Sequence, residues 1–241
     1  MIKFFILKLL LIFFLLNIYL FSQSENIGFS VSSGVGLISS SKIFPNPKSS
    51  DLIQRNKSYE IANVLAPFIE LKYHFNSELS IGLSAEYSSK MIKGNFVTAL
   101  SGNQLVELES EDGYSFIPIE ISIFQTLPFS TNDFNFNIGG GLGYYFAFFK
   151  RNFGNAVVQN VESSPVFGIQ VSTSVEYKLF EYIKIYLQTK YRAPEIKVKS
   201  KYDKNEIVYK NRTITILQDT FDTKISVNGV VLTLGLSVNF N

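Results

Sequence analysis

The chain has 241 residues, and its 22 basic and 20 acidic residues give a formal net charge of +2 at pH 7. This near balance argues against a nucleic-acid partner. The sequence contains no cysteine, which excludes disulfides and thiolate chemistry.

The first 24 residues are typical of a secretory signal peptide. Lys3 and Lys8 come first, the chain is then apolar from Leu9 to Phe21, and Ser22 and Ser24 are small residues where a signal peptidase reads the chain. We therefore expect cleavage after Ser24. A retained membrane helix is the alternative, because the run is long and nearly uncharged. In both cases residues 25–241 are exported and form one domain.

Eight segments of this domain alternate apolar residues with polar or small ones. In chain order they are 27–37, 65–75, 79–87, 117–123, 134–148, 167–179, 183–192 and 229–240. A period of two indicates strands with two different faces. Each segment has around ten residues, a length that crosses a bilayer when the strand is tilted.

Short and long connections alternate between these segments. The long polar connections are 40–58, 89–113, 150–164 and 195–228, and the others are tight turns. Short turns on one side and long loops on the other are typical of an outer-membrane barrel. We predict that the long segments are extracellular loops and that both chain ends lie on the periplasmic side.

The non-apolar faces carry charges, which decides between two barrel types. These charges are Glu70, Lys72, Glu86, Glu120, Glu176, Lys178, Lys184, Lys190 and Arg192. A lipocalin-like soluble barrel would turn the apolar faces inward, but eight strands leave too little room for so many large side chains. Outward faces of this kind in water would aggregate, whereas lipid accommodates them. We therefore predict an all-β, transmembrane, antiparallel up-and-down β-barrel of about eight strands, with a polar lumen and a lipid-facing apolar exterior.

Three stretches, "FIPIEISIF", "FNFNIGGGLGYYFAFF" and the final "LTLGLSVNF", carry a family resemblance. The chain resembles the OmpA/OmpX-like outer-membrane β-barrel family, of the type found in Bacteroidetes. The resemblance implies residence in the bacterial outer membrane, contact with its lipid and lipopolysaccharide, and a last strand that the barrel-assembly machinery recognises. In this sequence that assembly signal corresponds to Leu232, Leu234, Leu236, Val238 and Phe240. The family pattern ends on the aromatic residue, whereas Asn241 follows it here.

No enzyme chemistry is expected. The glycines from 139 to 143 do not form a phosphate loop, because the dinucleotide fingerprint needs a glycine at Tyr144 and a helix afterwards. His74, the only histidine, is a conceivable general base, as in lipid A acyl-modifying enzymes of the outer membrane. Those enzymes act near the outer rim, whereas His74 is predicted at the periplasmic end. One histidine and no cysteine give no support for a metal site, and no cofactor is expected.

The lumen is predicted to contain a charge network of Glu86, Glu120, Lys190 and Arg192. Counted from the periplasmic turns, the four residues lie seven to ten positions along their strands, at similar depth on inner faces. Two carboxylates and two cations would compensate one another across a narrow barrel, and an unpaired charge would be costly. The alternative is that water fills the gap and solvates each charge separately.

The pattern favours a monomeric structural or surface-interaction protein that works through its long extracellular loops, with a partner that the sequence does not identify. A small pore or transporter for small or apolar molecules is the alternative, although eight strands leave no aqueous channel. An outer-membrane lipid-modifying enzyme is a third option.

Overall fold

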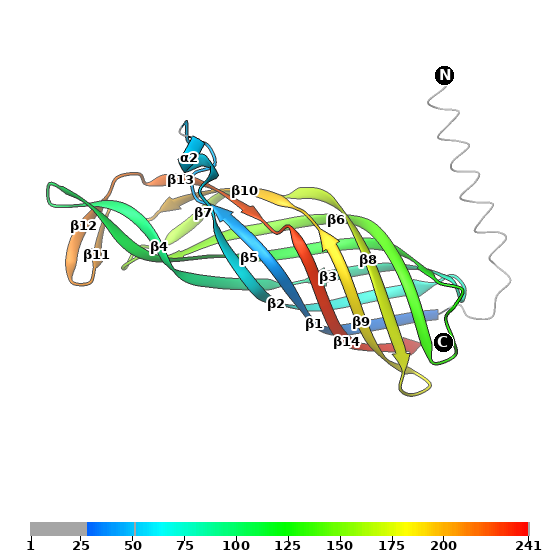
Figure 1. Ribbon diagram of the computed structural model, residues 1–241. Helices are drawn as coiled ribbons and strands as arrows, with labels where there is room; N and C mark the ends of the chain where they lie inside the picture. The colour runs from blue at the N-terminus through cyan, green and yellow to red at the C-terminus, as the bar shows by residue number, and fades with distance from the viewer. Residues whose placement is uncertain (1–27, 51, 241) are drawn as a thin grey trace, which may run out of the picture.

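The computed structural model describes residues 28–50 and 52–240, so the predicted signal peptide lies outside the described residues. The described chain is one antiparallel sheet, and eight of its strands close into a ring (Figure 1). The ring strands are β1 (Gly28–Phe44), β2 (Tyr59–His74), β3 (Leu79–Glu86), β5 (Gln104–Thr126), β6 (Phe134–Asn152), β8 (Val166–Lys178), β9 (Ile183–Arg192) and β14 (Gly229–Phe240). Over its described residues, each predicted segment falls in one ring strand to within one residue, which confirms the predicted barrel.

The last strand closes the ring against the first. β14 pairs with β1 from the Phe29–Phe240 pair to the Ile38–Val231 pair. Gly34 and Gly235 face each other in this ladder, and a Cβ atom on either one would collide with backbone atoms of the partner strand. Glycine therefore permits the close approach of the two strands that complete the barrel.

The outer surface of the ring is an apolar band. Large exposed side chains on it include Phe29, Leu37, Leu65, Ile69, Leu71, Leu83, Ile119, Ile121, Ile123, Leu142, Phe167, Ile169, Leu187, Leu232, Leu234 and Leu236. Within the described residues, no helix is long and apolar enough to cross a membrane. The strands present the surface that a membrane-spanning barrel turns toward lipid.

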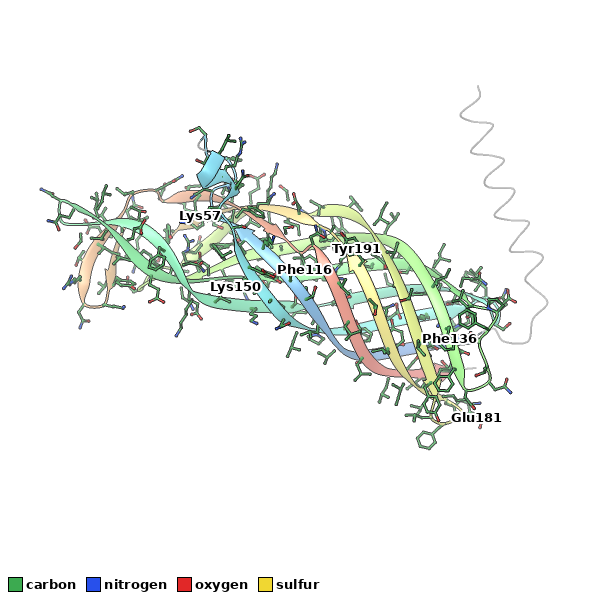
Figure 2. All side chains as sticks on the ribbon, viewed as in Figure 1. Lys57, Phe116, Phe136, Lys150, Glu181 and Tyr191 are labelled. Atoms are coloured by element: carbon green, nitrogen blue, oxygen red, sulfur yellow. The ribbon has the colours of Figure 1, made fainter. Side chains whose placement is uncertain are left out.

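Aromatic rings gather at both edges of the apolar band. At the edge with the tight turns, Phe134 and Tyr177 lie 4.8 Å apart between ring centres. Figure 2 shows Phe136 and Glu181 at this end and Tyr191 farther along the molecule. Toward the opposite edge, Tyr144 lies 4.5 Å from Phe167. Such clusters match the aromatic girdles of membrane barrels.

Beyond the apolar band the sheet continues as a β-structured extension. It contains β4 (Ser88–Ser101), β7 (Val158–Ser164), β10 (Glu195–Tyr202), β11 (Glu206–Tyr209), β12 (Arg212–Ile216), β13 (Thr220–Ser226) and the upper parts of several ring strands, together with the short helix α2 (Leu52–Asn56). Figure 1 shows these elements continuing the barrel at the end opposite to the C-terminus. The prediction of long loops at 89–113, 150–164 and 195–228 is therefore wrong, because most of these residues form paired strands.

The extension forms because the apolar face of the sheet, which points outward in the band, points inward beyond the edge of the band. In β9, Tyr191 points outward and Arg192 points inward. In β10 the charged Lys197 is exposed, and its apolar neighbours Ile196 and Val198 are buried. An apolar inner face gives the extension its own core. Charged residues on the outer face made the same segments resemble loops in the sequence.

Candidate functional site

The inner wall of the ring is polar. Its buried polar residues include Ser30, Ser32, Glu70, Lys72, Ser84, Glu86, Glu120, Ser122, Gln170, Ser172, Ser174, Glu176, Gln188, Lys190, Arg192, Thr233 and Ser237. Strand alternation places these side chains opposite the apolar band on every strand. A polar interior lined by charges is the candidate functional site.

The structure brings together the four charged residues that the sequence singled out. Lys190 Nζ lies 2.7 Å from Glu86 Oε1 and 2.6 Å from Glu120 Oε2. Arg192 donates to the same two carboxylates, at 2.6 Å to Glu86 Oε2 and 3.1 Å to Glu120 Oε1. Each carboxylate therefore contacts both cations, and the charges of this network, the Glu86–Arg192 network, sum to zero.

The Glu86–Arg192 network crosses the lumen. Glu86 lies on β3 and the two cations lie on β9, which are opposite strands in the order β1-β2-β3-β5-β6-β8-β9-β14. All four side chains are at most 6% exposed. Water therefore has little access to these charges, and each ion depends on its partners for compensation.

Two aromatic rings cover the network on the side of the extension. Tyr145 donates a hydrogen bond to Glu120 Oε1 at 3.1 Å, and its ring stacks on Phe116 at a centre distance of 5.9 Å. A Cβ atom at Gly168 would come within 2.9 Å of the Tyr145 ring, so the glycine provides the space for it. Tyr145 was not among the residues predicted from the sequence, although it lies in the same phase as the inward-facing glycines of β6.

Above these rings the interior is filled with apolar side chains. The buried cluster consists of Ile38, Ile43, Ile61, Val64, Ala66, Tyr114, Phe116, Tyr145, Ala147, Phe149, Ile196, Val198, Ile225, Val227 and Val231. These residues come from ring strands, from β10 and β13, and from the connection after β13, which contributes Val227. The path from the network toward the extension therefore runs into a packed core.

A second group of charges lies nearer the tight turns. Lys72 Nζ is 3.2 Å from both Glu70 Oε2 and Glu176 Oε1, and Lys184 Nζ is 3.1 Å from Glu176 Oε2. The Lys72 ammonium also lies 4.5 Å from the centre of the Phe124 ring. The alternation in the sequence predicts these charges on inner faces but does not indicate that they pair with one another.

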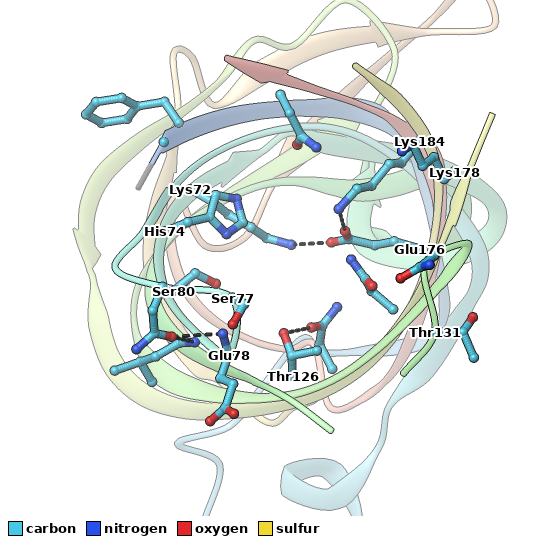
Figure 3. Close-up of a pocket in the computed structure, with 18 of the residues that line it drawn as sticks. Lys72, His74, Ser77, Glu78, Ser80, Thr126, Thr131, Glu176, Lys178 and Lys184 are labelled. Atoms are coloured by element: carbon cyan, nitrogen blue, oxygen red, sulfur yellow. Dashed lines mark hydrogen bonds and ion pairs between the residues drawn. The ribbon is translucent and has the colours of Figure 1, made fainter. Parts of the chain in front are cut away.

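A polar cavity of about 410 Å³ opens at the end with the tight turns (Figure 3). Lys72, Glu176 and Lys184 form its inner boundary, and His74 also lines it. His74 Nε2 lies 2.9 Å from Ser30 Oγ. Among the described residues, no group of three or more potential ligands could hold a metal ion.

The residues of the predicted assembly signal lie along β14. Leu232, Leu234, Leu236 and Phe240 are exposed on the apolar band, and Val238 is partly exposed. Phe240 is the register partner of Phe29 at the start of β1. Recognition of this strand by an assembly machinery stays a prediction.

Solved structures of outer-membrane proteins have folds similar to that of this chain. The chain is similar to the outer-membrane protein OprG of Pseudomonas aeruginosa, with a TM-score of 0.60 and 14% identity over 90% of this chain and 98% of that one. Neisserial surface protein A gives a TM-score of 0.46 at 14% identity, covering 88% and 97%. The Escherichia coli outer membrane protein W gives 0.43 at 11%, covering 90% and 99%.

No protein-family model matches the chain, and no curated protein matches its sequence. At 14% identity, the likeness to OprG concerns the fold. The chain thus has the fold of a small outer-membrane β-barrel, with a lumen crossed by the Glu86–Arg192 network.

Proposed function

We propose that this protein is a closed outer-membrane barrel that serves as a structural or surface-interaction protein. Its β-structured extension, rather than a set of loops, is the surface offered to a partner outside the cell. The outer-membrane location is supported by the apolar band and by the fold shared with OprG. Membership of the OmpA/OmpX-like family belongs to the same proposal.

The observation that carries this proposal is the Glu86–Arg192 network. An eight-stranded barrel has an interior that side chains alone can fill. Here salt bridges of 2.7 and 2.6 Å join Glu86 on β3 to Lys190 and Arg192 on the opposite strand, and the packed apolar cluster lies above them. Opening a path would separate buried ions and leave them without compensation, at a large cost in free energy.

The extension suits an interaction surface because it is ordered and charged on the outside. Glu107 and Glu109 are exposed on β5, and Lys197, Lys199 and Lys201 are exposed on β10. A paired sheet holds these side chains at fixed spacings, so a partner would bind without the entropy cost of ordering loops.

A pore or transporter is the second candidate, and the 410 Å³ polar cavity favours it, since a small polar solute has room to enter there. The second group of charges, with Lys72, Glu176 and Lys184, lines that cavity, and the Glu86–Arg192 network lies beyond it. We propose no catalytic role for His74, because it lies at the end of the barrel where β1 begins and β14 ends.

Outer-membrane lipid and lipopolysaccharide are the proposed surroundings of the apolar band. The barrel-assembly machinery is the proposed partner of β14 during insertion. The proposed mature protein is a monomer, because the ring closes within one chain and leaves no edge strand in the band.

The absence of cysteine permits a direct test of location and orientation. Leu105 lies at the tip of the β4–β5 hairpin and Phe180 in the β8–β9 turn, and both side chains are exposed. In intact cells a membrane-impermeant maleimide should label Leu105→Cys and should spare Phe180→Cys, which becomes reactive after cell lysis. Labelling of Phe180→Cys alone in intact cells, or recovery of both variants from the soluble fraction, would refute the proposal.

A further inference from the structure

A second cavity, of about 260 Å³, lies in the extension, far from the polar cavity of Figure 3. Its walls include Phe96 and Val97 of β4, Ile216 and Leu217 at the end of β12, and Phe221 of β13. Arg151 and Tyr202 also line it. Asn46, Thr98 and Gln218 add polar side chains, and Arg151 is the only charged residue among the described lining residues. The cavity therefore combines apolar walls with polar groups, one of which is a guanidinium.

Arg151 is held rigidly by its partners. Its Nε donates to Asp112 Oδ1 at 2.7 Å, one terminal nitrogen donates to Asp112 Oδ2 at 2.6 Å, and the other donates to the Tyr202 hydroxyl at 2.9 Å. The Arg151 side chain is 9% exposed, and its guanidinium carbon lies 4.9 Å from the centre of the Phe221 ring. The group is therefore fixed in position before any ligand arrives.

The guanidinium has hydrogen-bonding capacity left over. An arginine has about five N–H donors, and the three hydrogen bonds of Arg151 use one each. The other donors, on the two terminal nitrogens, suit an oxygen acceptor brought into the pocket. An oxygen acceptor that reached these donors would gain a hydrogen bond to a charged group.

The charge balance restricts the kind of acceptor. Asp112 already neutralises Arg151 in a bidentate ion pair, and the Asp112 side chain is 1% exposed. A carboxylate ligand would add a second negative charge to a buried pair whose charge is already zero, and it would lose its own hydration. An uncharged carbonyl oxygen accepts the spare hydrogen bonds without that cost.

The volume restricts the size of the ligand. Pockets for drug-sized ligands usually have about 300–1,000 Å³, and this cavity has about 260 Å³. The apolar walls favour a compact hydrocarbon body. We propose that the extension binds small uncharged molecules that combine an apolar body with one carbonyl oxygen, which accepts hydrogen bonds from Arg151. This proposal does not depend on whether the lumen is closed.

Acetophenone is a suitable probe. Ethylbenzene is a matched compound that lacks the carbonyl oxygen, and benzoate is one that carries a negative charge. The full-length mature protein in lipid nanodiscs would be titrated with each, and the methyl signals of Val97, Ile216 and Leu217 followed by NMR. We expect saturable shifts with acetophenone. Ethylbenzene and benzoate should each bind at least about ten-fold more weakly than acetophenone. Ethylbenzene lacks the hydrogen bond to a charged donor, and benzoate would bury a charge.

Variants separate the pocket from nonspecific partition into lipid. Leu217→Trp fills the pocket at a side chain that is 53% exposed, and it should abolish the acetophenone shifts of Val97 and Ile216. Leu105→Trp, at a 67% exposed residue outside the pocket, is the control and should leave them unchanged. Equal shifts in both variants would overturn the proposal.

A second pair of substitutions tests the guanidinium. Asp112→Leu combined with Arg151→Met removes the whole ion pair, a replacement that buried pairs often tolerate without loss of stability. The folded double variant should bind acetophenone and ethylbenzene equally. If acetophenone keeps its advantage there, or if benzoate binds most tightly to the unmodified protein, the assignment of Arg151 to a neutral acceptor is wrong.

Discussion

The guanidinium carbon of Arg192 lies 5.1 Å from the centre of the Phe116 ring, at the boundary between the charged and the apolar halves of the interior. On one side Arg192 binds Glu86 and Glu120, and on the other the ring joins the buried apolar cluster. Figure 2 shows Phe116 between the end marked by Glu181 and the extension marked by Lys57. The charge network and the apolar cluster, which both block the lumen, therefore meet at the Arg192–Phe116 pair.

Removing the two carboxylates of the network should destabilise the barrel. In Glu86→Ala with Glu120→Ala, Lys190 and Arg192 keep their charges without partners, and breaking a buried pair costs about 3–5 kcal/mol. Urea unfolding in lipid vesicles measures the loss. Glu107→Ala with Glu109→Ala, on the exposed face of β5, is the matched control and should change the free energy of unfolding little. Equal stability of the two double variants would contradict mutual compensation in the lumen.

The apolar band should reject charge at mid-depth. Leu187 lies in the middle of β9 and is 44% exposed on the band. Leu187→Arg should cost about 2–4 kcal/mol, because arginine on the lipid face of a barrel is unfavourable near the midplane. Val208→Arg, at a 46% exposed residue of β11 in the extension, should be nearly neutral in the same unfolding assay. A similar loss of stability at both sites would show that the assigned boundary between the apolar band and the extension is wrong.

The last strand should decide assembly. Phe240→Asp introduces a charge at the register partner of Phe29 and removes the terminal aromatic of the proposed signal. We expect loss of the heat-modifiable form from outer-membrane fractions. Asn239→Asp, one residue away and paired with Ser30, should assemble normally. Normal amounts of folded Phe240→Asp in the outer membrane would refute the role assigned to β14.

The closing seam should be sensitive to a single methyl group. A Cβ atom at Gly34 would collide with Leu234 and Gly235 backbone atoms, whereas a Cβ atom at Gly140 would meet only Gln170 O, at 3.6 Å. Gly34→Ala should therefore lose about 1–3 kcal/mol of stability, as overpacked sites do, and Gly140→Ala should lose little. Thermal unfolding in detergent compares them, and a greater loss in Gly140→Ala would contradict the seam geometry.

The extension should lose stability in alkali. Tyr59, in the part of β2 above the apolar band, donates a hydrogen bond of 2.7 Å to Asp112. Burial and the Asp112 charge raise the pKa of Tyr59 above its ordinary value. The folded state therefore holds this proton while the unfolded state releases it above about pH 10, so stability falls as the pH rises beyond that value.

Tyr59→Phe should make unfolding of the extension less dependent on pH between about 9 and 11, since no proton is released at that position. Proteolysis of the extension after brief exposure to each pH is the measurement. Tyr182→Phe, at a residue that is 52% exposed in the β8–β9 turn, is the control. The prediction fails if the Tyr182 variant alters the pH dependence as much as the Tyr59 variant does.

The barrel itself was predictable because one physical rule acts along each ring strand. In β9, for example, Leu187 and Tyr191 face outward while Gln188 and Arg192 face inward, and the sequence shows the same alternation. The contact between the four charged residues was also predictable, because they lie at similar numbers of residues from the tight turns. They are Glu86, Glu120, Lys190 and Arg192. The covering ring of Tyr145 was missed, because the interior was assumed to be polar throughout.

The extension was not predicted because its inner face is apolar and its outer face is charged, the reverse of the ring. Ile196 and Val198 alternate with Lys197 and Lys199 as regularly as any membrane strand. The alternation was visible, but the lysines suggested solvent and therefore a loop. The apolar residues change phase across Pro194, which was the signal that the water-facing extension includes the strand after it.

Single-channel recording in planar lipid bilayers tests the closed lumen most directly. The mature, heat-modifiable protein should be inserted at known density, with a large porin as the positive control for incorporation. We predict no steady conductance, because the Glu86–Arg192 network and the apolar cluster block the interior in series. A large, stable conductance of the unmodified protein would contradict the closed lumen and favour the pore.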